Sequence, residues 1–514
     1  MMRSNRQSDQ SSGFTRTKRV LGLTLGVSWL SFRNQKYKAS EKLVQGLQEL
    51  GGIYTKFLQI LVNLMPDFPG VTDDIRHNVF SKPSYQDVDV IDALGSNLDA
   101  NDLMRISQIQ NQPFASGSFA QVYEALLDNQ MPVIIKILRP HIRRQLKTDL
   151  RLLAVLARLA QPLIRSDIVS TVRLYKDYKR TVMQEISYRK EVESALLMAE
   201  EYAGNTKIVI PTTYTELCTP EIIVQEKLEG ISLSSLLQQA GGNGSLAIEI
   251  AKSQLGTDII DQLSELGFSL ISSSIEGPYM YGDPHPGNII FMRDGRVGII
   301  DFGVILPQVV NPYDLYDVLA NEGLMNYDHN ASTNIAEHIL KVFRLYNPKI
   351  YRALERLDKD IKSTSLLQEL VELVDRIIEP SKNMIRNSYN RGLGIPTRVI
   401  MDALNGKDQN NRFGLMAYEP TARLARAQSQ FWNAAEQLGL IRETSVEVHR
   451  KLREKFNNII DSFKKEESMS FSEASEIIND WFTELMQRDP LLFRELFAKI
   501  RKTLQEYEKE PSNA

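Results

Sequence analysis

Short apolar runs bounded by glycine, proline or charged residues lie in the middle of the chain, with apolar residues at helical spacing around and between them. The short runs predict a strand-loop-strand at residues 115–122 and strands at residues 133–136, 222–228, 289–292 and 296–300. The helical spacing predicts helices at residues 141–160, 171–202 and 245–267 and throughout the region after Pro307. We therefore expect an α+β fold whose strands are confined to the centre of the chain.

The order of these elements divides the chain into five parts. We expect a basic tail and short apolar helix in residues 1–37, a helical extension in 38–100, a strand-rich smaller lobe in 101–230, a larger lobe in 231–400 and a helical region in 401–514. A connector is expected at residues 66–83, a turn at 241–244, and loops at 405–411 and 466–472. Near the end, we expect an apolar stripe that either packs in the core or contacts a partner helix; it consists of Leu492, Leu496, Ile500 and Leu504.

The apolar run nearest the amino terminus extends from Val20 to Phe32. As a helix it would span about 20 Å, less than the roughly 30 Å of a bilayer core, so it is not expected to cross a membrane. Arg33 and Lys36 follow it without a small-residue cleavage site, which does not fit a signal peptide. Trp29 and the flanking basic residues leave two interpretations, a helix lying in the membrane interface or a helix packed on the core.

Composition limits the class of protein further. A chain of 514 residues with 42% hydrophobic residues can bury more than one core. The formal net charge of −3 argues against binding nucleic acid through bulk charge. Cys218 is the only cysteine, so we expect no intrachain disulfide and a cytoplasmic location. No cysteine and histidine residues have the spacing of a zinc site, and the charged, amphipathic residues 443–514 offer no membrane-spanning hairpin.

The strongest chemical signal is Asp283-Pro-His-Pro-Gly-Asn288, followed after two predicted strands by Asp301-Phe-Gly. In a kinase-like site the first Asp orients the attacking oxygen, the Asn binds one Mg²⁺, and the Asp of Asp-Phe-Gly binds the metal that bridges the phosphates. Asp283 and Asn288 have the required separation, and Asp301 lies 18 residues after Asp283. A turn at residues 294–295 would aim both carboxylates into one cleft. His285 either holds this loop or takes part in the chemistry.

Upstream, residues 115–122 follow the spacing of the kinase glycine loop, with alanine at its first and third glycine positions. Small residues let backbone N–H groups approach phosphate oxygens, so we expect nucleotide contacts here. Lys136 ends an apolar strand 14 residues after the loop, in the place of the lysine that pairs with the α- and β-phosphates. An ordinary hairpin explains the loop alone, but not the loop together with Lys136. The expected contacts are Ala115, Ser116, Gly117, Ser118 and Val122.

A lysine that binds phosphates needs a carboxylate to hold it. Glu185, Glu191 and Glu193 all lie within residues 171–202, and their spacing does not choose between them. Further on, the strand at residues 222–228 has the position of the hinge between two lobes. Backbone groups around Glu226 would there read an adenine edge, and a plain core strand is the alternative interpretation.

These motifs together make the chain resemble the UbiB family of atypical protein-kinase-like proteins over roughly residues 42–325. The family has the same Asp-Pro-His-Pro-Gly-Asn loop, an alanine-rich phosphate loop, and a Lys-x-Gly-Gln motif similar to Lys56-Phe-Leu-Gln59. Lys56 and Gln59 are three residues apart and share one face of a helix. Three residues differ from the family's pattern: Leu58, Gly117 and Ser187.

The resemblance implies a two-lobed protein-kinase-like fold with a helical N-terminal extension and a helical C-terminal region. It also implies that Glu191 pairs with Lys136. Lys56 and Gln59 would lie on one overlying helix, with Lys56 facing Glu185. In the family this helix lies across the active site, where a protein substrate would dock. A small acceptor or water is then expected in place of a protein.

The expected function is that of an atypical kinase-like ATPase or phosphotransferase whose cofactors are ATP and Mg²⁺. Lys136, oriented by Glu191, would bind the phosphates. Asn288 and Asp301 would hold metal in the interlobe cleft, and Asp283 would orient the attacking oxygen. By resemblance the protein would support ubiquinone-type isoprenoid quinone biosynthesis, with a membrane lipid or quinone precursor as partner and a peripheral place at the membrane. The alternatives are a small-molecule phosphotransferase, favoured by the Gly117 loop, and a nucleotide-binding pseudokinase scaffold.

Overall fold

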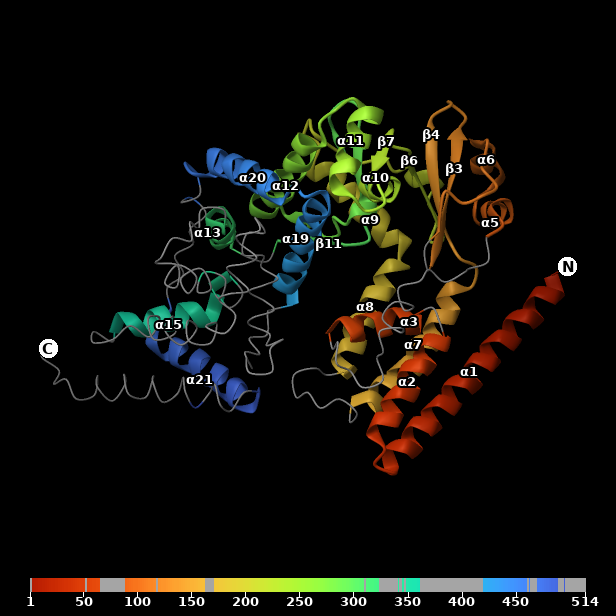
Figure 1. Cartoon of the computed structure of the whole chain (residues 1–514), viewed down its shortest axis with the longest axis horizontal. Coiled ribbons are helices and arrows are strands. Elements are labelled where there is room, and N and C mark those ends of the chain that lie inside the picture. Colours follow the sequence, from red (N-terminus) through yellow and green to blue (C-terminus); the bar gives the residue numbers. More distant parts are fainter. Residues whose placement is uncertain are drawn as a thin grey trace, which may run out of the picture. The chain divides into compact units, whose positions relative to one another are not determined.

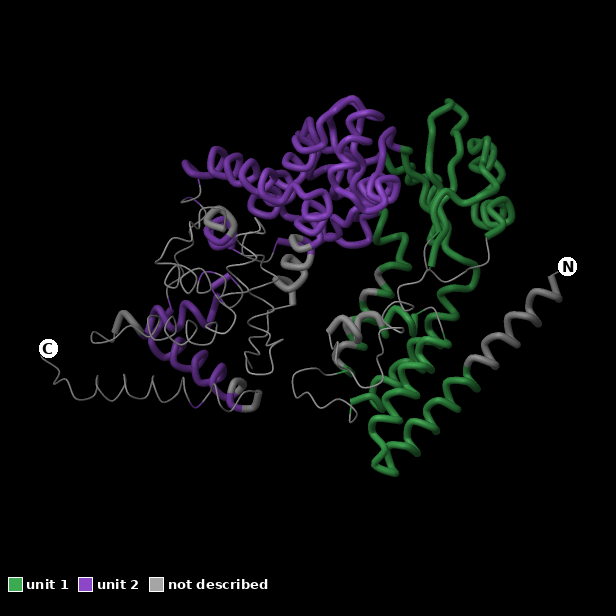
Figure 2. Tube along the Cα trace, viewed as in Figure 1, with its two compact units in different colours: residues 1–193, 212–227 green, residues 194–211, 228–514 purple. Residues whose placement is uncertain are grey.

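A computed structural model describes residues 2–50, 53–64, 88–116, 119–161, 171–308, 311–322, 341, 344–345, 348–360, 419–459, 462, 469–488 and 494. The chain divides into two compact units, drawn in different colours in Figure 2. Unit 1 comprises residues 1–193 and 212–227, and unit 2 comprises residues 194–211 and 228–514. Residues 194–211 belong to unit 2 in part because a strand within them pairs with a strand of that unit.

Unit 1 contains an antiparallel sheet in the order β1-β3-β4-β6, with β2 paired to β3. Its strands β3, β4 and β6 are labelled in Figure 1. Alternate side chains of its two central strands are buried, as a half-buried sheet requires. One face packs on α5 (Val90–Asn97), which is followed by the short helix α6 (Ala100–Met104). The strands are β1 (Ile106–Ser107), β2 (Ala115–Ser116), β3 (Ala120–Leu127), β4 (Pro132–Leu138) and β6 (Ile222–Glu226).

The long helices of unit 1 share a second hydrophobic core, which also includes Phe119 and Ile223 from the sheet region. The first helix begins at Met2, so the segment expected as a basic tail is helical; it contains no proline to interrupt the hydrogen-bond ladder. No helix in the described part of the chain is long and apolar enough to cross a membrane. The helices are α1 (Met2–Phe32), α2 (Lys36–Leu50), α3 (Ile53–Leu64) and α7 (Ile142–Ala160).

The single helix expected at residues 171–202 is wrong, because the structure has two helices there. They are α8 (Thr171–Glu185) and α9 (Tyr188–Glu201). At the break, Ile186 is buried and its carbonyl accepts a hydrogen bond from Arg143 Nη2 of α7 (3.1 Å). This tertiary contact satisfies a backbone group that the helical ladder would otherwise use. Glu185 and Glu191 therefore lie on different helices.

Unit 2 contains a sheet in the order β5-β10-β9-β7 and a separate pair, β8 with β11. The predicted hairpin at residues 289–300 is present, since β9 and β10 pair antiparallel. The candidate catalytic loop joins β8 to β9, and the Asp-Phe-Gly segment joins β10 to β11. The strands are β5 (Ile208–Val209), β7 (Gly230–Ser232), β8 (Tyr279–Tyr281), β9 (Ile289–Met292), β10 (Val297–Ile299) and β11 (Ile305–Pro307).

The helix expected at residues 245–267 is also divided in the structure. Gly256 has a φ of 73°, a left-handed conformation that ends α11 (Gly244–Leu255), and its N–H caps the carbonyl of Lys252. Asp258 then caps α12 (Ile259–Glu276) by accepting a hydrogen bond from Ile260 N (2.9 Å). Before these, α10 (Leu233–Gln239) ends at the expected glycine turn, where two glycines have positive φ.

Further helices of unit 2 are α13 (Pro312–Glu322), α15 (Pro348–Asp360), α19 (Glu419–Leu438), α20 (Ile441–Phe456) and α21 (Phe471–Arg488). Because α21 begins at Phe471, the loop expected at residues 466–472 is too long at its end. The connector at 66–83, the loop at 405–411 and the four apolar residues of the expected terminal stripe lie outside the described residues. In the core of unit 2, α19 packs against α11 and β11.

Candidate functional site

Lys136 lies near the end of β4 and pairs with Glu191 in the first turn of α9. Lys136 Nζ is 2.7 Å from Glu191 Oε1, and the Glu191 side chain is only 4% exposed. The ammonium group also lies 5.6 Å from the centroid of the Tyr188 ring. Of the three carboxylates that the spacing left open, the structure brings Glu191 to Lys136. Glu193 is exposed and pairs with Arg189 instead.

The glycine-loop region has the expected strand-loop-strand form. Ala115 and Ser116 form β2, where Ala115 pairs with Val122 of β3, and Val122 pairs in turn with Lys136 of β4. Ser116 Oγ accepts a hydrogen bond from Arg139 Nη2 (2.8 Å), which fixes the first strand of the hairpin. The tip of the loop, Gly117 and Ser118, lies outside the described residues.

The helix that carries Lys56 is tied to the rest of unit 1 by an ion pair. Lys56 Nζ of α3 donates to both carboxylate oxygens of Glu185, each at 2.8 Å. Lys56 Nζ also lies 5.3 Å from the centroid of the ring of Phe119, the residue that directly follows Gly117 and Ser118 of the glycine loop. Gln59 is on the same helix, but its side chain is not described. The structure thus places Lys56 beside both Glu185 and the base of the phosphate-loop hairpin.

The backbone donors of the expected hinge are occupied. Glu226 N donates to Thr212 O (2.8 Å) and Lys227 N donates to Pro132 O (2.9 Å). The Glu226 side chain accepts hydrogen bonds from Thr212 N and Oγ1. Strand and turn pairing thus use these two backbone donors. The expectation that backbone groups around Glu226 read an adenine edge stays a prediction, and it falls to groups other than these two N–H groups.

The candidate catalytic loop is a short helical turn, η3 (Pro286–Asn288), held by its own side chains. Asn288 is buried, and its Nδ2 donates to the backbone carbonyl of Asp283 (3.1 Å), which leaves the amide oxygen as the atom able to face a cation. His285 Nδ1 accepts from Gly287 N (3.0 Å), so His285 acts here as a structural cap of the turn. Its Nε2 is 3.9 Å from Asp283 Oδ2, too far for a hydrogen bond.

Asp301 has a φ of 65°, which is rare for a residue other than glycine. The turn is held by Tyr281 of β8, whose single hydroxyl hydrogen is shared between the carbonyls of Ile300 (2.7 Å) and Asp301 (3.2 Å). Phe302 is fully buried against the edge of the Tyr281 ring, with centroids 5.9 Å apart. The Asp301 carboxylate also accepts from Gly303 N (3.2 Å). Backbone strain at a residue held in this way is typical of functional sites.

One residue of the site was not predicted from the sequence. Gln430 of α19 donates from Nε2 to Asp283 Oδ1 at 2.7 Å. Gln430 lies 147 residues after Asp283, and no local motif marks it. The helical region after residue 400 therefore contributes directly to the surroundings of the candidate catalytic carboxylate.

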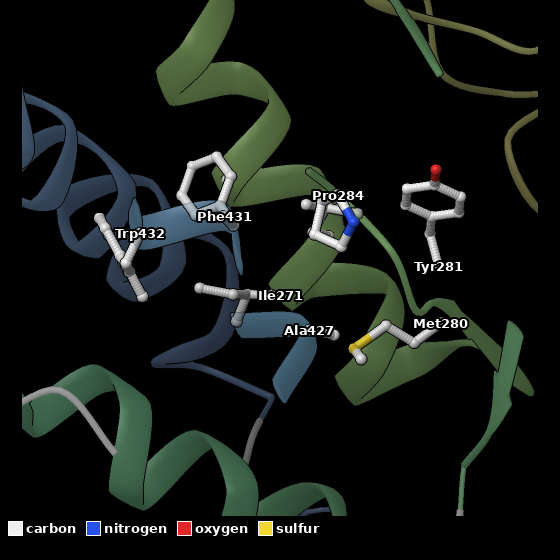
Figure 3. A pocket seen from close by; sticks show the side chains of 9 residues that line it. Ile271, Met280, Tyr281, Pro284, Ala427, Phe431 and Trp432 are labelled. Atoms are coloured by element: carbon white, nitrogen blue, oxygen red, sulfur yellow. The ribbon is translucent and has the colours of Figure 1, made fainter. Parts of the chain in front are cut away.

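An apolar pocket lies beside the candidate catalytic loop within unit 2 (Figure 3). Pro284 of the loop faces it, together with Met280 of β8 and Ile271 of α12. On the other side, Phe431 and Trp432 of α19 contribute their rings, which meet edge to face with centroids 5.0 Å apart. The pocket is completed by Gly267, Leu270, Tyr281 and Ala427.

The residues present fit a magnesium ion that arrives with nucleotide. Mg²⁺ prefers oxygen ligands and is usually bound by one or two protein groups together with phosphates and water. Asp301 and Asn288 offer a carboxylate and an amide oxygen of that kind. Within the described residues, no group of three or more histidine, cysteine, aspartate or glutamate side chains could hold a metal alone. These ligands suit a metal bound together with phosphates better than a permanent metal centre.

Cys218 lies next to β6 in unit 1, and its sulfur accepts a hydrogen bond from Val224 N (3.4 Å). Burial raises the pKa of the Cys218 thiol, and the negative charges of Glu216 and Glu191 add to this, against a hydrogen bond from Val224 N. The sulfur also donates to Tyr214 O (3.3 Å). The thiol is therefore kept protonated and hydrogen-bonded, which is typical of a structural cysteine and not of a nucleophile.

Comparison with known proteins supports the assignment of the fold. Residues 81–333 match the family model described as "ABC1 atypical kinase-like domain". The "Probable protein kinase UbiB" of Pseudomonas aeruginosa (strain LESB58) is 27% identical over 277 residues, 53% of this chain and 49% of that protein. The protein of the same name from Azotobacter vinelandii (strain DJ) is 26% identical over 296 residues, 56% of this chain and 52% of that protein. The chain thus spans about half the length of the curated relatives it matches.

Among solved structures, the chain is similar to "The complex structure of Rv3197-erythromycin from Mycobacterium tuberculosis". The TM-score is 0.44 and the sequence identity 20%, with 70% of this chain and 82% of that chain covered. The α+β, kinase-like fold and the UbiB-type resemblance expected from the motifs are confirmed by the family match and the curated relatives.

Proposed function

Because residues 81–333 match the model of the ABC1 atypical kinase-like domain, we propose that the protein is a UbiB-like kinase that binds Mg²⁺-ATP and catalyses reaction at its γ-phosphate. The observation that carries the proposal is the 2.7 Å ion pair between Lys136 and the buried Glu191. A buried ion pair contributes little net stability, because its desolvation offsets its attraction. In kinases this pair has a function, since it holds an ammonium group ready for phosphate.

The phosphates are bound by residues of both candidate motifs. Lys136, held by Glu191, contacts the α- and β-phosphates, and the backbone from Ala115 to Val122 lies along them. Asn288 and Asp301 hold Mg²⁺, which when bound neutralises charge on the phosphate oxygens. The strained backbone of Asp301 and the Asn288 bond to the Asp283 carbonyl support this assignment, because both side chains are oriented before any ligand arrives.

Asp283 orients the attacking oxygen. In hydrolysis, the oxygen of a water molecule bonds to the γ-phosphorus, the bond to the bridging oxygen breaks, and ADP and inorganic phosphate leave. The Asp283 carboxylate accepts the hydrogen bond of this water, and the water's proton passes to solvent. Its side chain is 25% exposed, so a small molecule has access to it.

Lys56, Glu185 and Gln59 act as regulatory residues in this proposal. The Lys56–Glu185 pair and the contact of Lys56 with Phe119 support a role for α3 in limiting access to the phosphate-loop hairpin. A folded protein substrate is then disfavoured, and water or a small molecule is the acceptor. The resemblance of the motifs to the UbiB family supports isoprenoid quinone biosynthesis as the process served and a membrane lipid or quinone precursor as the small partner.

We also propose that the protein associates with the membrane surface through α1. One side of this helix packs in the core through Val20, Leu23 and Val27. Another side exposes apolar residues at helical spacing, and Arg33 stacks on one of their rings (4.4 Å to the centroid). Exposed apolar residues flanked by basic ones favour an interfacial helix. The stripe consists of Leu21, Leu25, Trp29 and Phe32.

The fate of the γ-phosphate tests the proposal against its alternatives. The protein is incubated with Mg²⁺ and ATP labelled at the γ-phosphate, with and without a membrane extract. We expect label mainly as free phosphate. Label on a lipid or metabolite would identify a small-molecule phosphotransferase, which the glycine at position 117 favours. Binding of ATP without any change in the label would identify a pseudokinase scaffold and contradict the proposal of catalysis.

A further inference from the structure

Gln430 is the residue outside the kinase-like domain that reaches the candidate catalytic carboxylate. It lies 97 residues after residue 333, where the family match ends, yet its Nε2 donates to Asp283 Oδ1 at 2.7 Å. An ionised carboxylate only accepts hydrogen bonds, so the carboxamide must face it with its NH₂ group. The orientation of the Gln430 amide is therefore fixed by Asp283.

The helix that carries Gln430 is held closely against its neighbours. A Cβ atom added at Gly267 of α12 would lie 2.4 Å from Cζ of Phe431, the residue next to Gln430. A Cβ added at Gly244 of α11 would lie 2.5 Å from the carbonyl oxygen of Gln437. At Gly244 a side chain would meet the backbone of α19, so the helix would have to shift, and at Gly267 it would meet the Phe431 ring, which would have to move. Two close contacts along one helix fix where Gln430 lies.

The amide oxygen of Gln430 indicates that stability of the fold alone does not explain a glutamine at this position. Its Oε1 is buried and has no hydrogen-bond partner among the residues that the structure describes. Buried polar atoms are nearly always paired, and an unpaired one destabilises the fold. An apolar residue like the neighbouring Phe431 would avoid this cost. What glutamine provides at this position, and an apolar residue could not, is the hydrogen bond from its Nε2 to Asp283.

We infer that Gln430 is a positioning residue for Asp283, an inference that rests on the proposed function. Its hydrogen bond holds Oδ1 and so fixes the rotation of the carboxylate, which leaves Oδ2 to accept from the attacking oxygen. In the described part of the chain, no other side chain is within hydrogen-bond distance of this carboxylate; His285 Nε2 is 3.9 Å away. The region after the kinase-like domain thus completes the site.

The test compares full-length variants of α19. Gln430→Met keeps the length of the side chain but removes its donor, and Gln430→Glu keeps its shape but places a second carboxylate beside Asp283. Gln437→Met is the matched control, because Gln437 is an exposed glutamine on the same helix. We measure kcat and KM for ATP turnover, the Kd of Mg²⁺-ATP and the melting temperature of each variant.

We expect kcat to fall at least tenfold in Gln430→Met and further in Gln430→Glu, with the Kd of Mg²⁺-ATP changed less than twofold. Gln437→Met should match the unchanged protein. In an Asp283→Asn background, Gln430→Met should lower turnover no further, because the group that it positions is gone. A purely structural role would instead lower kcat and the melting temperature in both backgrounds.

Each other outcome contradicts the inference in a recognisable way. Unchanged turnover in Gln430→Met, with turnover lost in Asp283→Asn, overturns the role of Gln430 and leaves the proposed function intact. A rise in turnover shows that Gln430 covers Asp283 and does not position it. If Gln430→Met does not fold, Gln430→Glu carries the same test. Absence of Mg²⁺-ATP binding by the unchanged protein overturns the proposed function and the inference with it.

Discussion

Tyr281 holds Asp301 in a left-handed backbone conformation. The Tyr281 hydroxyl donates to the Asp301 carbonyl at 3.2 Å and to the preceding carbonyl at 2.7 Å. A strained residue of this kind costs about 1–3 kcal/mol. The hydroxyl has one hydrogen, which the two carbonyls share, so this interaction of about 1 kcal/mol offsets part of that cost. The carboxylate that would hold metal is therefore oriented by the fold before the ligand binds.

Asp301→Asn should abolish Mg²⁺-dependent nucleotide binding while preserving the fold. Asparagine tolerates the left-handed conformation well, so the substitution removes charge without adding backbone strain. Calorimetric titration with ATP in the presence and absence of Mg²⁺ measures the effect. Asp294→Asn, in the exposed turn before β10, is the control. If Asp301→Asn keeps its Mg²⁺-dependent affinity, the metal assignment is wrong.

Glu191→Gln should weaken Mg²⁺-ATP binding by about tenfold, or about 1.4 kcal/mol. The substitution leaves Lys136 without its charged partner, so the ammonium group is no longer held toward the phosphates. Glu193→Gln is a matched control on the same helix, because Glu193 forms an exposed pair with Arg189. Equal Kd values for the two variants would show that the Glu191–Lys136 pair does not support nucleotide binding.

Lys56→Met should change access to the site more than stability. The Lys56–Glu185 pair is about one-third exposed on each side, and such pairs contribute roughly 0–1 kcal/mol. We therefore expect the free energy of unfolding to change by less than about 1 kcal/mol, while labelled phosphate appears on a generic protein acceptor. Glu185→Gln should have the same effect, and the double variant no more than either single one. Protein labelling that stays at the level of the unchanged chain would contradict a covering role for α3.

The sequence predicted the hairpin between the two candidate motifs well, because a hairpin depends on short spacing. Asp283 and Asn288 lie on one turn, and the β9–β10 hairpin that separates them from Asp301 has a clear strand-turn-strand pattern. Helix boundaries were predicted less well. At the break after Glu185, the carbonyl of Ile186 accepts a hydrogen bond from Arg143 of another helix, a tertiary contact that local spacing does not predict.

The role of Gln430 at the site could not be predicted from the sequence. Its contact with Asp283 joins residues 147 positions apart, and it depends on the seating of α19 on Gly244 and Gly267. A glutamine within a helix has no distinguishing spacing. Only the tertiary packing of the helix shows that this one lies at the site.

Cys218 should react slowly with iodoacetamide at pH 8. Burial raises the pKa of its thiol, so little thiolate is present at that pH. The protonated thiol contributes stability below its unfolded pKa, and that contribution is lost as pH rises through the raised folded pKa. Labelling followed by mass spectrometry should be at least about tenfold faster in unfolding concentrations of urea. Equal rates would show that the Cys218 region is open in the native protein.

Leu25→Glu should lower recovery of the protein with anionic liposomes and leave Mg²⁺-ATP affinity unchanged. Leu25 is 70% exposed within the apolar stripe of α1, so a charge there opposes insertion without disturbing the core. Leu246→Glu on α11 is the control, because it places the same charge at an exposed leucine of a different helix. Equal liposome recovery for both variants would exclude α1 as the membrane contact.

The most direct test of the central claim is ATP turnover by the unchanged protein and by Asp283→Asn at saturating Mg²⁺-ATP. The account predicts Mg²⁺-dependent release of phosphate by the unchanged protein. It predicts at least a hundredfold loss in the variant, with nucleotide affinity preserved within about twofold, as expected for a group that acts only on the attacking oxygen. Equal turnover by the two proteins, or no turnover by either, would contradict the account.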